Sequence, residues 1–141
     1  MLRSKKGFTL IELMVVVVII GILALLGLRL YLTQIAKSND ALIKANAGTI
    51  QTTIQAALAD EAAATIFARW DIAATPNLII ESGIHNPMSK LPQATTPDEA
   101  GAAPGEVWVE YSASGAIFTI NGRNAADTGN VYTTTDLVAK Y

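Results

Sequence analysis

The sequence predicts an α+β fold in which one long N-terminal helix packs on a small antiparallel sheet of three or four strands. The first observation is an apolar run, since 20 of the 25 residues from Phe8 to Leu32 are apolar. The second is a helical periodicity after this run, with no proline before Pro76. The third is a set of short C-terminal segments of strand-forming residues, separated by glycine turns. A chain of 141 residues suffices for one such domain.

The apolar run is predicted to cross a membrane as a helix. Glu12 is the only charged residue among the 21 from Phe8 to Leu28, and as a helix they would extend about 30 Å, the thickness of a bilayer core. A lone segment in lipid is helical because its backbone groups can bond only to one another. The basic residues among the first six positions predict a cytoplasmic N-terminus and a C-terminal domain outside.

A cleaved secretory signal peptide and a plain membrane anchor are two simpler interpretations of this run. A signal peptide has an apolar stretch of about 7–15 residues and then a small-residue cleavage site, whereas this run is longer and no such site follows Leu28. A plain anchor remains open, but it leaves Glu12 unexplained. A carboxylate inside an apolar helix costs a few kcal/mol or more to bury, so Glu12 is predicted to be functional.

Glu12 is predicted to need a cationic partner. Arg29 lies 17 residues further on, which is about 25 Å along a helix and too far for a contact. A cut just before Phe8 would create an α-amino cation close by. The amine of a neighbouring subunit would be better placed to meet the carboxylate than the chain's own amine.

Residues 5–14 resemble the N-terminal signature of type IV pilins, a basic leader ending in glycine, then phenylalanine, then a glutamate fifth in the mature chain. They read Lys5-Lys6-Gly7-Phe8-Thr9-Leu10-Ile11-Glu12-Leu13-Met14. The resemblance is close from Lys5 to Leu28 and covers the rest of the chain only in layout. The same signature occurs in pseudopilins of type II secretion and competence systems.

The resemblance implies a pilin-like fold and a set of partners. A prepilin peptidase would cut between Gly7 and Phe8 and methylate the new Phe8 amine, and Glu12 would pair with that amine in an adjacent subunit. The precursor would wait in the cytoplasmic membrane until an assembly platform stacks it into a helical homopolymer at the cell surface. Many family members have a proline where this chain has Arg29, so Gly21 and Gly27 are the predicted sites of helix flexibility.

The predicted domains are a leader at 1–7, a membrane and filament-core helix at 8–32, and a head domain at 33–141. The head divides into an amphipathic helix at 33–70, a proline-rich loop at 71–105 and an antiparallel sheet at 106–141. The amphipathic face consists of Ile43, Ala47, Ile50, Ile54, Ala57 and Leu58. We expect one helix from Thr9 to about Phe67; two helices broken near residues 38–40 are the alternative.

The proline-rich loop contains all five prolines of the chain, and residues 77–81 are expected to form a short strand or helical turn within it. Strands are predicted at 106–111, 116–120 and 130–135. Turns are predicted at Ser114-Gly115 and at Asn121-Gly122.

The sequence predicts no enzyme, no cofactor and no metal site. His85 stands alone in the proline-rich loop, and Glu106 and Glu110 flank a strand, which favours solvated surface over acid–base chemistry. Asp127, Asn130 and Asp136 offer oxygen ligands, so a calcium site remains an alternative, although their spacing matches no EF-hand loop. With no cysteine, neither a disulfide nor a thiolate site can form.

Direct nucleic-acid binding is not predicted. From Thr33 onward the chain has 6 basic and 11 acidic side chains, a net charge of −5, which repels phosphates. An aromatic stacking track on the surface is the alternative, but core packing is the expected use of Trp108 and Phe118.

The sequence therefore predicts a structural subunit of a type IV pilus used for adhesion, motility or DNA uptake. A pseudopilin of a secretion or competence system is the first alternative. A monomeric membrane-anchored extracytoplasmic binding domain that never polymerises is an alternative of another class.

Overall fold

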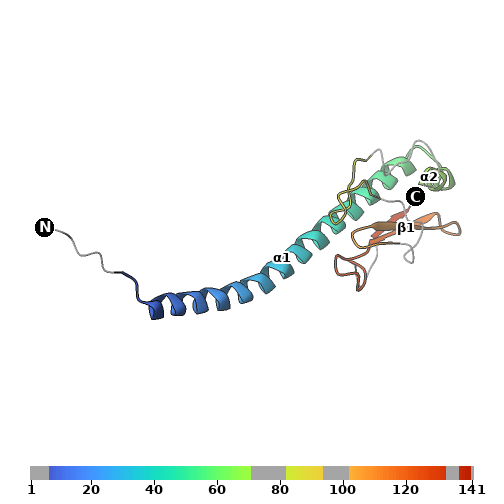
Figure 1. Cartoon of the computed structure of the whole chain (residues 1–141). Helices are drawn as coiled ribbons and strands as arrows, with labels where there is room; N and C mark the ends of the chain where they lie inside the picture. The colour runs from blue at the N-terminus through green and yellow to red at the C-terminus, as the bar shows by residue number, and fades with distance from the viewer. Residues whose placement is uncertain (1–6, 71–81, 94–101, 133–136, 141) are drawn as a thin grey trace. The chain divides into compact units, whose positions relative to one another are not determined.

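The computed structural model describes residues 7–70, 82–93, 102–132 and 137–140, which form two compact units with a boundary between Ile35 and Ala36 (Figure 1). The elements are α1 (Leu10–Leu58), α2 (Ala63–Trp70), β1 (Val107–Ser112), β2 (Ile117–Gly122) and β3 (Leu137–Lys140). The α+β fold class is confirmed, because within the 36–141 unit the second part of α1 packs on a three-stranded antiparallel sheet.

The predicted amphipathic face of α1 is the face that meets the sheet. Its buried residues are Ile43, Ala47, Ile50, Ile54 and Leu58, while Ala57 is partly buried against them. Three- and four-residue spacing keeps these side chains on one side of the helix, where they share a core with Val109, Phe118 and Ile120. No break occurs near residues 38–40, so the two-helix alternative at that position is wrong.

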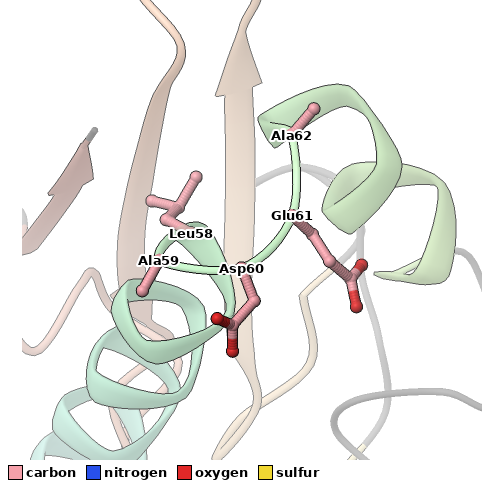
Figure 2. Close-up of a pocket in the computed structure, with 5 residues that line it drawn as sticks. All are labelled: Leu58, Ala59, Asp60, Glu61 and Ala62. Carbon is pink, nitrogen blue, oxygen red and sulfur yellow. The ribbon is translucent and has the colours of Figure 1, made fainter.

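The helix ends at Leu58 rather than near Phe67, which corrects the expected length. A turn over residues 59–62 separates it from α2 (Figure 2). Ile66 explains the break, because it would lie about 120° around the helix from Ile54 if α1 continued at 3.6 residues per turn. The change of direction instead buries Ile66 completely and stacks Phe67 on Tyr111, with 5.0 Å between ring centroids. The complete burial of Ile66 and the stacking of Phe67 on Tyr111 stabilise this change of direction.

The sheet has the order β1-β2-β3, with both neighbouring pairs antiparallel. The first two strands and the Ser114-Gly115 turn agree with the prediction to within two residues. Trp108 and Phe118 are buried, which confirms their use in the core. The third strand was misplaced: β3 is Leu137–Lys140, while Asn130–Tyr132 forms no strand and residues 133–135 lie outside the described part.

Asn121 and Gly122 form the end of β2, so the turn predicted there is wrong. The Asn121 side chain is fully buried; its Nδ2 donates to the Tyr132 carbonyl at 3.0 Å and its Oδ1 accepts from the Tyr132 amide at 3.2 Å. Through these two bonds the Asn121 side chain pairs with the backbone at Tyr132, as the backbone of a neighbouring strand would. Glycine is required at position 122 because a Cβ there would collide with Cγ2 of Ile43. The glycine lets α1 approach the sheet closely.

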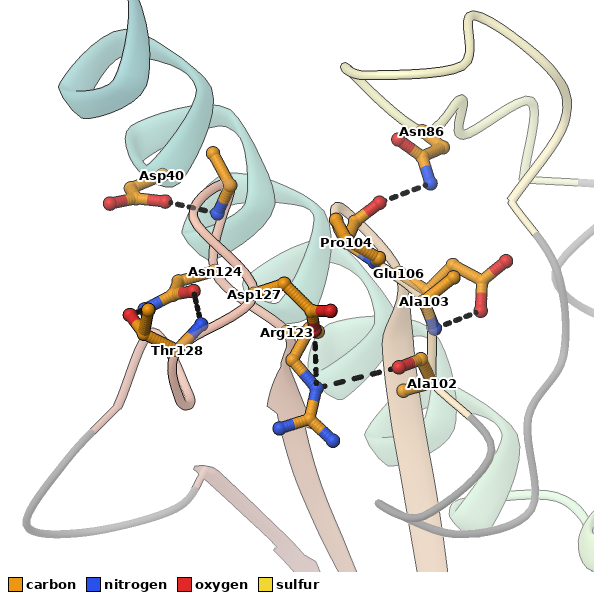
Figure 3. Close-up of polar contacts among 11 residues, drawn as sticks. Asp40, Asn86, Ala102, Ala103, Pro104, Glu106, Arg123, Asn124, Asp127 and Thr128 are labelled. Atoms are coloured by element: carbon orange, nitrogen blue, oxygen red, sulfur yellow. Dashed lines mark hydrogen bonds and ion pairs between the residues drawn. The ribbon is translucent and has the colours of Figure 1, made fainter. Parts of the chain in front are cut away.

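Side chains on two flanks of α1 tie the surrounding loops to it. On one flank, Nδ2 of Asn46 donates to the His85 carbonyl at 2.9 Å and Nδ2 of Asn39 donates to Sδ of Met88 at 3.2 Å. On the other flank, Oδ1 of Asp40 accepts from the Ala125 amide at 2.8 Å (Figure 3). The loops over 82–93 and 123–130 are thereby held near the first turns of α1 within this unit. The expected element at 77–81 lies outside the described residues.

Candidate functional site

The first part of α1 is an apolar helix with no protein cover. Its large apolar side chains are 40–77% exposed from Leu10 to Ile35, and Phe8 is 85% exposed. Within the described residues, this helix is the one long and apolar enough to span a membrane, with a window of mean hydropathy 3.0. Monomeric soluble proteins rarely expose a continuous apolar surface of this extent, so this segment requires lipid or other subunits around it.

The helix begins with a capping box built by Thr9 and Glu12. Oε2 of Glu12 accepts from the Thr9 amide and from the Thr9 hydroxyl, both at 2.9 Å, while the Glu12 amide donates to Oγ1 of Thr9 at 3.3 Å. The amides of Thr9 and Glu12, which have no partner in the helix ladder, are thus satisfied reciprocally. The threonine with a glutamate three residues later carries this signal, and the sequence analysis missed it.

The capping box changes how the Glu12 carboxylate is presented. Both hydrogen bonds that the carboxylate accepts from Thr9 use Oε2, and within the described residues Oε1 has neither a hydrogen bond nor an ion pair. Thr9 supplies hydrogen bonds but no formal positive charge, so within the described residues the Glu12 carboxylate has no cationic partner. The geometry leaves one oxygen of a fixed carboxylate available to a cation from outside.

The other predicted site residues have few contacts. A Cβ added at Gly7, Gly21 or Gly27 would meet nothing within 4 Å, so none is a glycine because of crowding here. Residues 21 and 27 lie inside α1, which is helical through both. Their flexibility during assembly, like cleavage between Gly7 and Phe8, remains a prediction.

Glu106 and Asp127, two of the polar residues considered for chemistry, have structural partners, whereas Asp136 lies outside the described residues. Arg123 donates from Nε to the Ala102 carbonyl at 3.4 Å and lies 3.7 Å from Oδ1 of Asp127, while Glu106 accepts from the Ala103 amide (Figure 3). His85 is exposed. Across the described segments, no group of three or more His, Cys, Asp or Glu side chains could hold a metal ion.

Replacing Thr9 with valine is expected to weaken the helix start by about 1 kcal/mol, because the hydroxyl cap is lost while the side-chain shape is kept. Amide hydrogen exchange of the full chain in detergent micelles would measure this as faster exchange over residues 10–13. Thr33→Val serves as the matched control, since its hydroxyl bonds only the Arg29 carbonyl in mid-helix. Equal exchange at residues 10–13 in the wild type and Thr9→Val would contradict the capping box.

Comparison with known proteins places the N-terminal site in context. A family model described as the prokaryotic N-terminal methylation motif matches residues 2–28. The chain is 36% identical over 125 residues to the type IV major fimbrial protein FimA of Dichelobacter nodosus, covering 88% of this chain and 75% of that protein.

Two further relatives match over shorter lengths. The type IV major alpha-pilin of Moraxella bovis is 44% identical over 57 residues, 40% of this chain and 36% of that protein. Fimbrial protein EcpB of Eikenella corrodens is 45% identical over 56 residues, 40% of this chain and 35% of that protein. No solved structure was found to match the chain.

Proposed function

This chain belongs to the type IV pilin family, and from that premise we propose that it is processed before Phe8 and polymerised into a helical surface filament. The observation that carries this proposal is the uncovered apolar helix with one anionic group near its start. The chain is a structural subunit, and the proposal assigns it no catalytic step. Adhesion, motility and DNA uptake are the uses that such a filament would serve.

The apolar helix would serve two environments in turn. Before assembly, its side chains are covered by lipid, with the N-terminus in the cytoplasm and the 36–141 unit outside. After an assembly platform extracts the subunit, the same side chains are covered by the helices of other copies in the filament core. Moving these side chains from lipid into the filament core changes their hydrophobic free energy little, because both surroundings are apolar. Helix packing and charge pairing must therefore decide how the subunits are arranged in the filament.

Processing would supply the cation that Glu12 lacks. Cleavage after Gly7 by a prepilin peptidase removes the leader at 1–7 and creates an α-amine on Phe8, which the same enzyme methylates. Oε1 of Glu12, which the capping box leaves open, would accept that amine from a neighbouring subunit. Pairing neutralises both charges in a medium of low dielectric constant and sets the axial register of the two helices.

Mass spectrometry of the mature protein tests the processing step. We expect an N-terminus at Phe8 with the mass of one added methyl group, in protein taken from sheared surface filaments. Deletion of the host prepilin peptidase should leave the leader attached and filaments absent. Mature filament protein that still begins at Met1 would overturn the proposed cleavage.

The two alternatives are not favoured. The relatives are described as fimbrial proteins and a pilin, whereas a secretion or competence pseudopilin would build a short periplasmic structure, and a binding domain would remain monomeric. Electron microscopy of sheared filaments, with identification of their main subunit, separates these functions. Long filaments that lack this protein would exclude its role as the main subunit.

A further inference from the structure

The apolar run at the start of the chain is longer than a bilayer core is thick. The 25 residues from Phe8 to Leu32 would extend about 37 Å as a helix, whereas the hydrocarbon core measures about 30 Å. The helix could therefore slide along the membrane normal by about 7 Å with apolar side chains still filling the core. Hydropathy alone does not fix its depth, so the two charged residues within the run, Glu12 and Arg29, must do so.

Two limiting depths differ in which charged residue enters the core. In the outer position, Arg29 lies at the outer boundary of the core, and Leu10, the first residue of α1, lies about 28 Å away at the inner boundary. In the inner position, Leu32 lies at the outer boundary and Glu12 lies about 30 Å away at the inner boundary. Arg29 is then about 4.5 Å inside the core, whereas the outer position instead places the Glu12 backbone about 3 Å inside it.

The Glu12 side chain reaches out of the core in the outer position. The Cα–Cβ bonds of a helix tilt toward its N-terminus, which faces the cytoplasm in the proposed orientation. Oε2 of Glu12 accepts from the amide and the hydroxyl of Thr9 at 2.9 Å, so the carboxylate lies beside the residue that precedes the first turn of α1. At this depth it would meet the water and headgroups of the inner surface, and its burial costs little.

The Arg29 side chain has no such route in the inner position. The same tilt directs its Cα–Cβ bond toward the cytoplasm, which is deeper into the core, so the side chain must fold back along the helix to reach the outer headgroups. Its guanidinium is exposed and has no hydrogen bond or ion pair within the described residues. Lipid headgroups or water must therefore compensate the charge, which favours the outer position. Tyr31, which is 63% exposed, then lies in the interfacial layer where tyrosine is enriched.

We propose that the Arg29 guanidinium binds phosphates of outer-leaflet phospholipids and holds the precursor in the outer position, with the Gly7–Phe8 bond at the cytoplasmic boundary of the membrane. A guanidinium suits this role because its planar fork binds phosphate oxygens through two parallel hydrogen bonds. The inference rests on the proposed function, which supplies the orientation and the cleavage. Arg29 is a positioning residue, since it acts on a bond about 30 Å away through the length of α1.

Labelling of a single cysteine measures this depth, because the chain has no cysteine of its own. Full-length Leu32→Cys precursor is placed in vesicles of phosphatidylethanolamine and phosphatidylglycerol, and a membrane-impermeant maleimide is added on the side of the 36–141 unit. In the outer position residue 32 lies about 4.5 Å beyond the core, so the thiol is expected to react. Adding Arg29→Leu should let α1 slide inward by about one turn, which buries Leu30, and should reduce the labelling at least fivefold.

Two matched variants show whether the cation at position 29 is responsible. Arg29→Lys keeps a cation that can reach phosphate, so it should keep most of the labelling. Lys37→Leu removes an exposed cation of α1 that lies beyond the apolar run, and it should leave the labelling unchanged. Equal labelling with and without Arg29→Leu would overturn the proposal and leave the proposed function standing, because the measurement uses uncleaved precursor and no filament.

Vesicles of digalactosyl diacylglycerol, an uncharged lipid without phosphate, test the lipid partner. The ratio of labelling between Leu32→Cys and Leu32→Cys/Arg29→Leu is expected to be at least twofold smaller there than in the phospholipid vesicles. An equal ratio in the two lipids would contradict binding to phosphate, because hydration of the guanidinium alone would then account for the depth.

Cleavage by prepilin peptidase in the phospholipid vesicles tests the positioning of the bond. Arg29→Leu is expected to slow cleavage before Phe8 at least fivefold, while Arg29→Lys remains close to the wild type. Arg29→Leu/Leu32→Arg restores the cation about one turn further on, at the boundary of the inner position, and should be cleaved as slowly as Arg29→Leu. Wild-type rates for Arg29→Leu would overturn the positioning role, whereas wild-type precursor that is never cleaved would contradict the proposed function.

Discussion

Glu12→Ala is expected to leave membrane insertion intact and to reduce filament yield at least tenfold. The variant removes a charge from an apolar helix, which makes insertion easier. In the filament, however, the Phe8 amine would then be buried without an anion, at a cost of several kcal/mol per subunit. About 1.4 kcal/mol corresponds to a factor of ten in an equilibrium constant. A cost of several kcal/mol in the filament therefore accounts for a fall in filament yield of at least tenfold. Quantifying sheared filaments against membrane-bound protein measures both effects.

Glu12→Gln separates charge from capping. Glutamine at this position can still accept from the Thr9 amide in a capping box, so the helix start should be kept while the negative charge is lost. We expect it to assemble as poorly as Glu12→Ala, whereas Thr9→Val should assemble far better than both. Glu110→Ala, at an exposed position on β1, controls for loss of an acid elsewhere. Normal filament yield from Glu12→Gln would show that hydrogen bonding rather than charge is the requirement.

Gly122→Ala is expected to destabilise the 36–141 unit by about 1–3 kcal/mol, which is the usual cost of an added methyl group in a packed core. The new Cβ would overlap Cγ2 of Ile43 and come within 3.3 Å of the Glu106 carbonyl oxygen. Neither neighbour can move freely, since Ile43 lies fully buried in the core cluster and the carbonyl accepts from the Arg123 amide. Thermal unfolding of the full chain in micelles, followed by tryptophan fluorescence, measures the loss.

Gly48→Ala is the matched control for this glycine. A Cβ there would meet nothing within 4 Å, so the change should stabilise α1 by up to about 1 kcal/mol through helix propensity. In Ile43→Ala/Gly122→Ala the collision with Cγ2 is relieved, and the double variant should therefore lose less than the sum of the single losses. Strict additivity of the two changes would argue against close packing between α1 and the end of β2.

Several parts of the fold were predicted from local patterns alone. The buried face of α1 was predicted correctly because its three- and four-residue spacing is a property of the chain itself. The first two strands were also placed well, since alternating side chains and a serine-glycine turn define a hairpin without distant partners. The capping box at Thr9 could have been predicted too, because its signal lies within four consecutive residues.

Other parts depend on partners far away in the sequence. Asn121-Gly122 has the composition of a turn, yet it extends β2 because Tyr132 and Ile43 supply a loop to bind and a helix to contact. The end of α1 likewise follows from the burial of Ile66, a residue in the next helix. The four-residue strand β3 carries no strong local signal and is defined by its pairing with β2.

The sequence by itself determined the uncovered apolar helix and the anion at Glu12, because hydropathy and charge belong to the residues whatever their neighbours are. Only the tertiary structure decided where α1 ends and which residues complete the sheet. Those features depend on which distant side chains share a core or a hydrogen bond, and the free energy of such contacts exists only once the chain has folded.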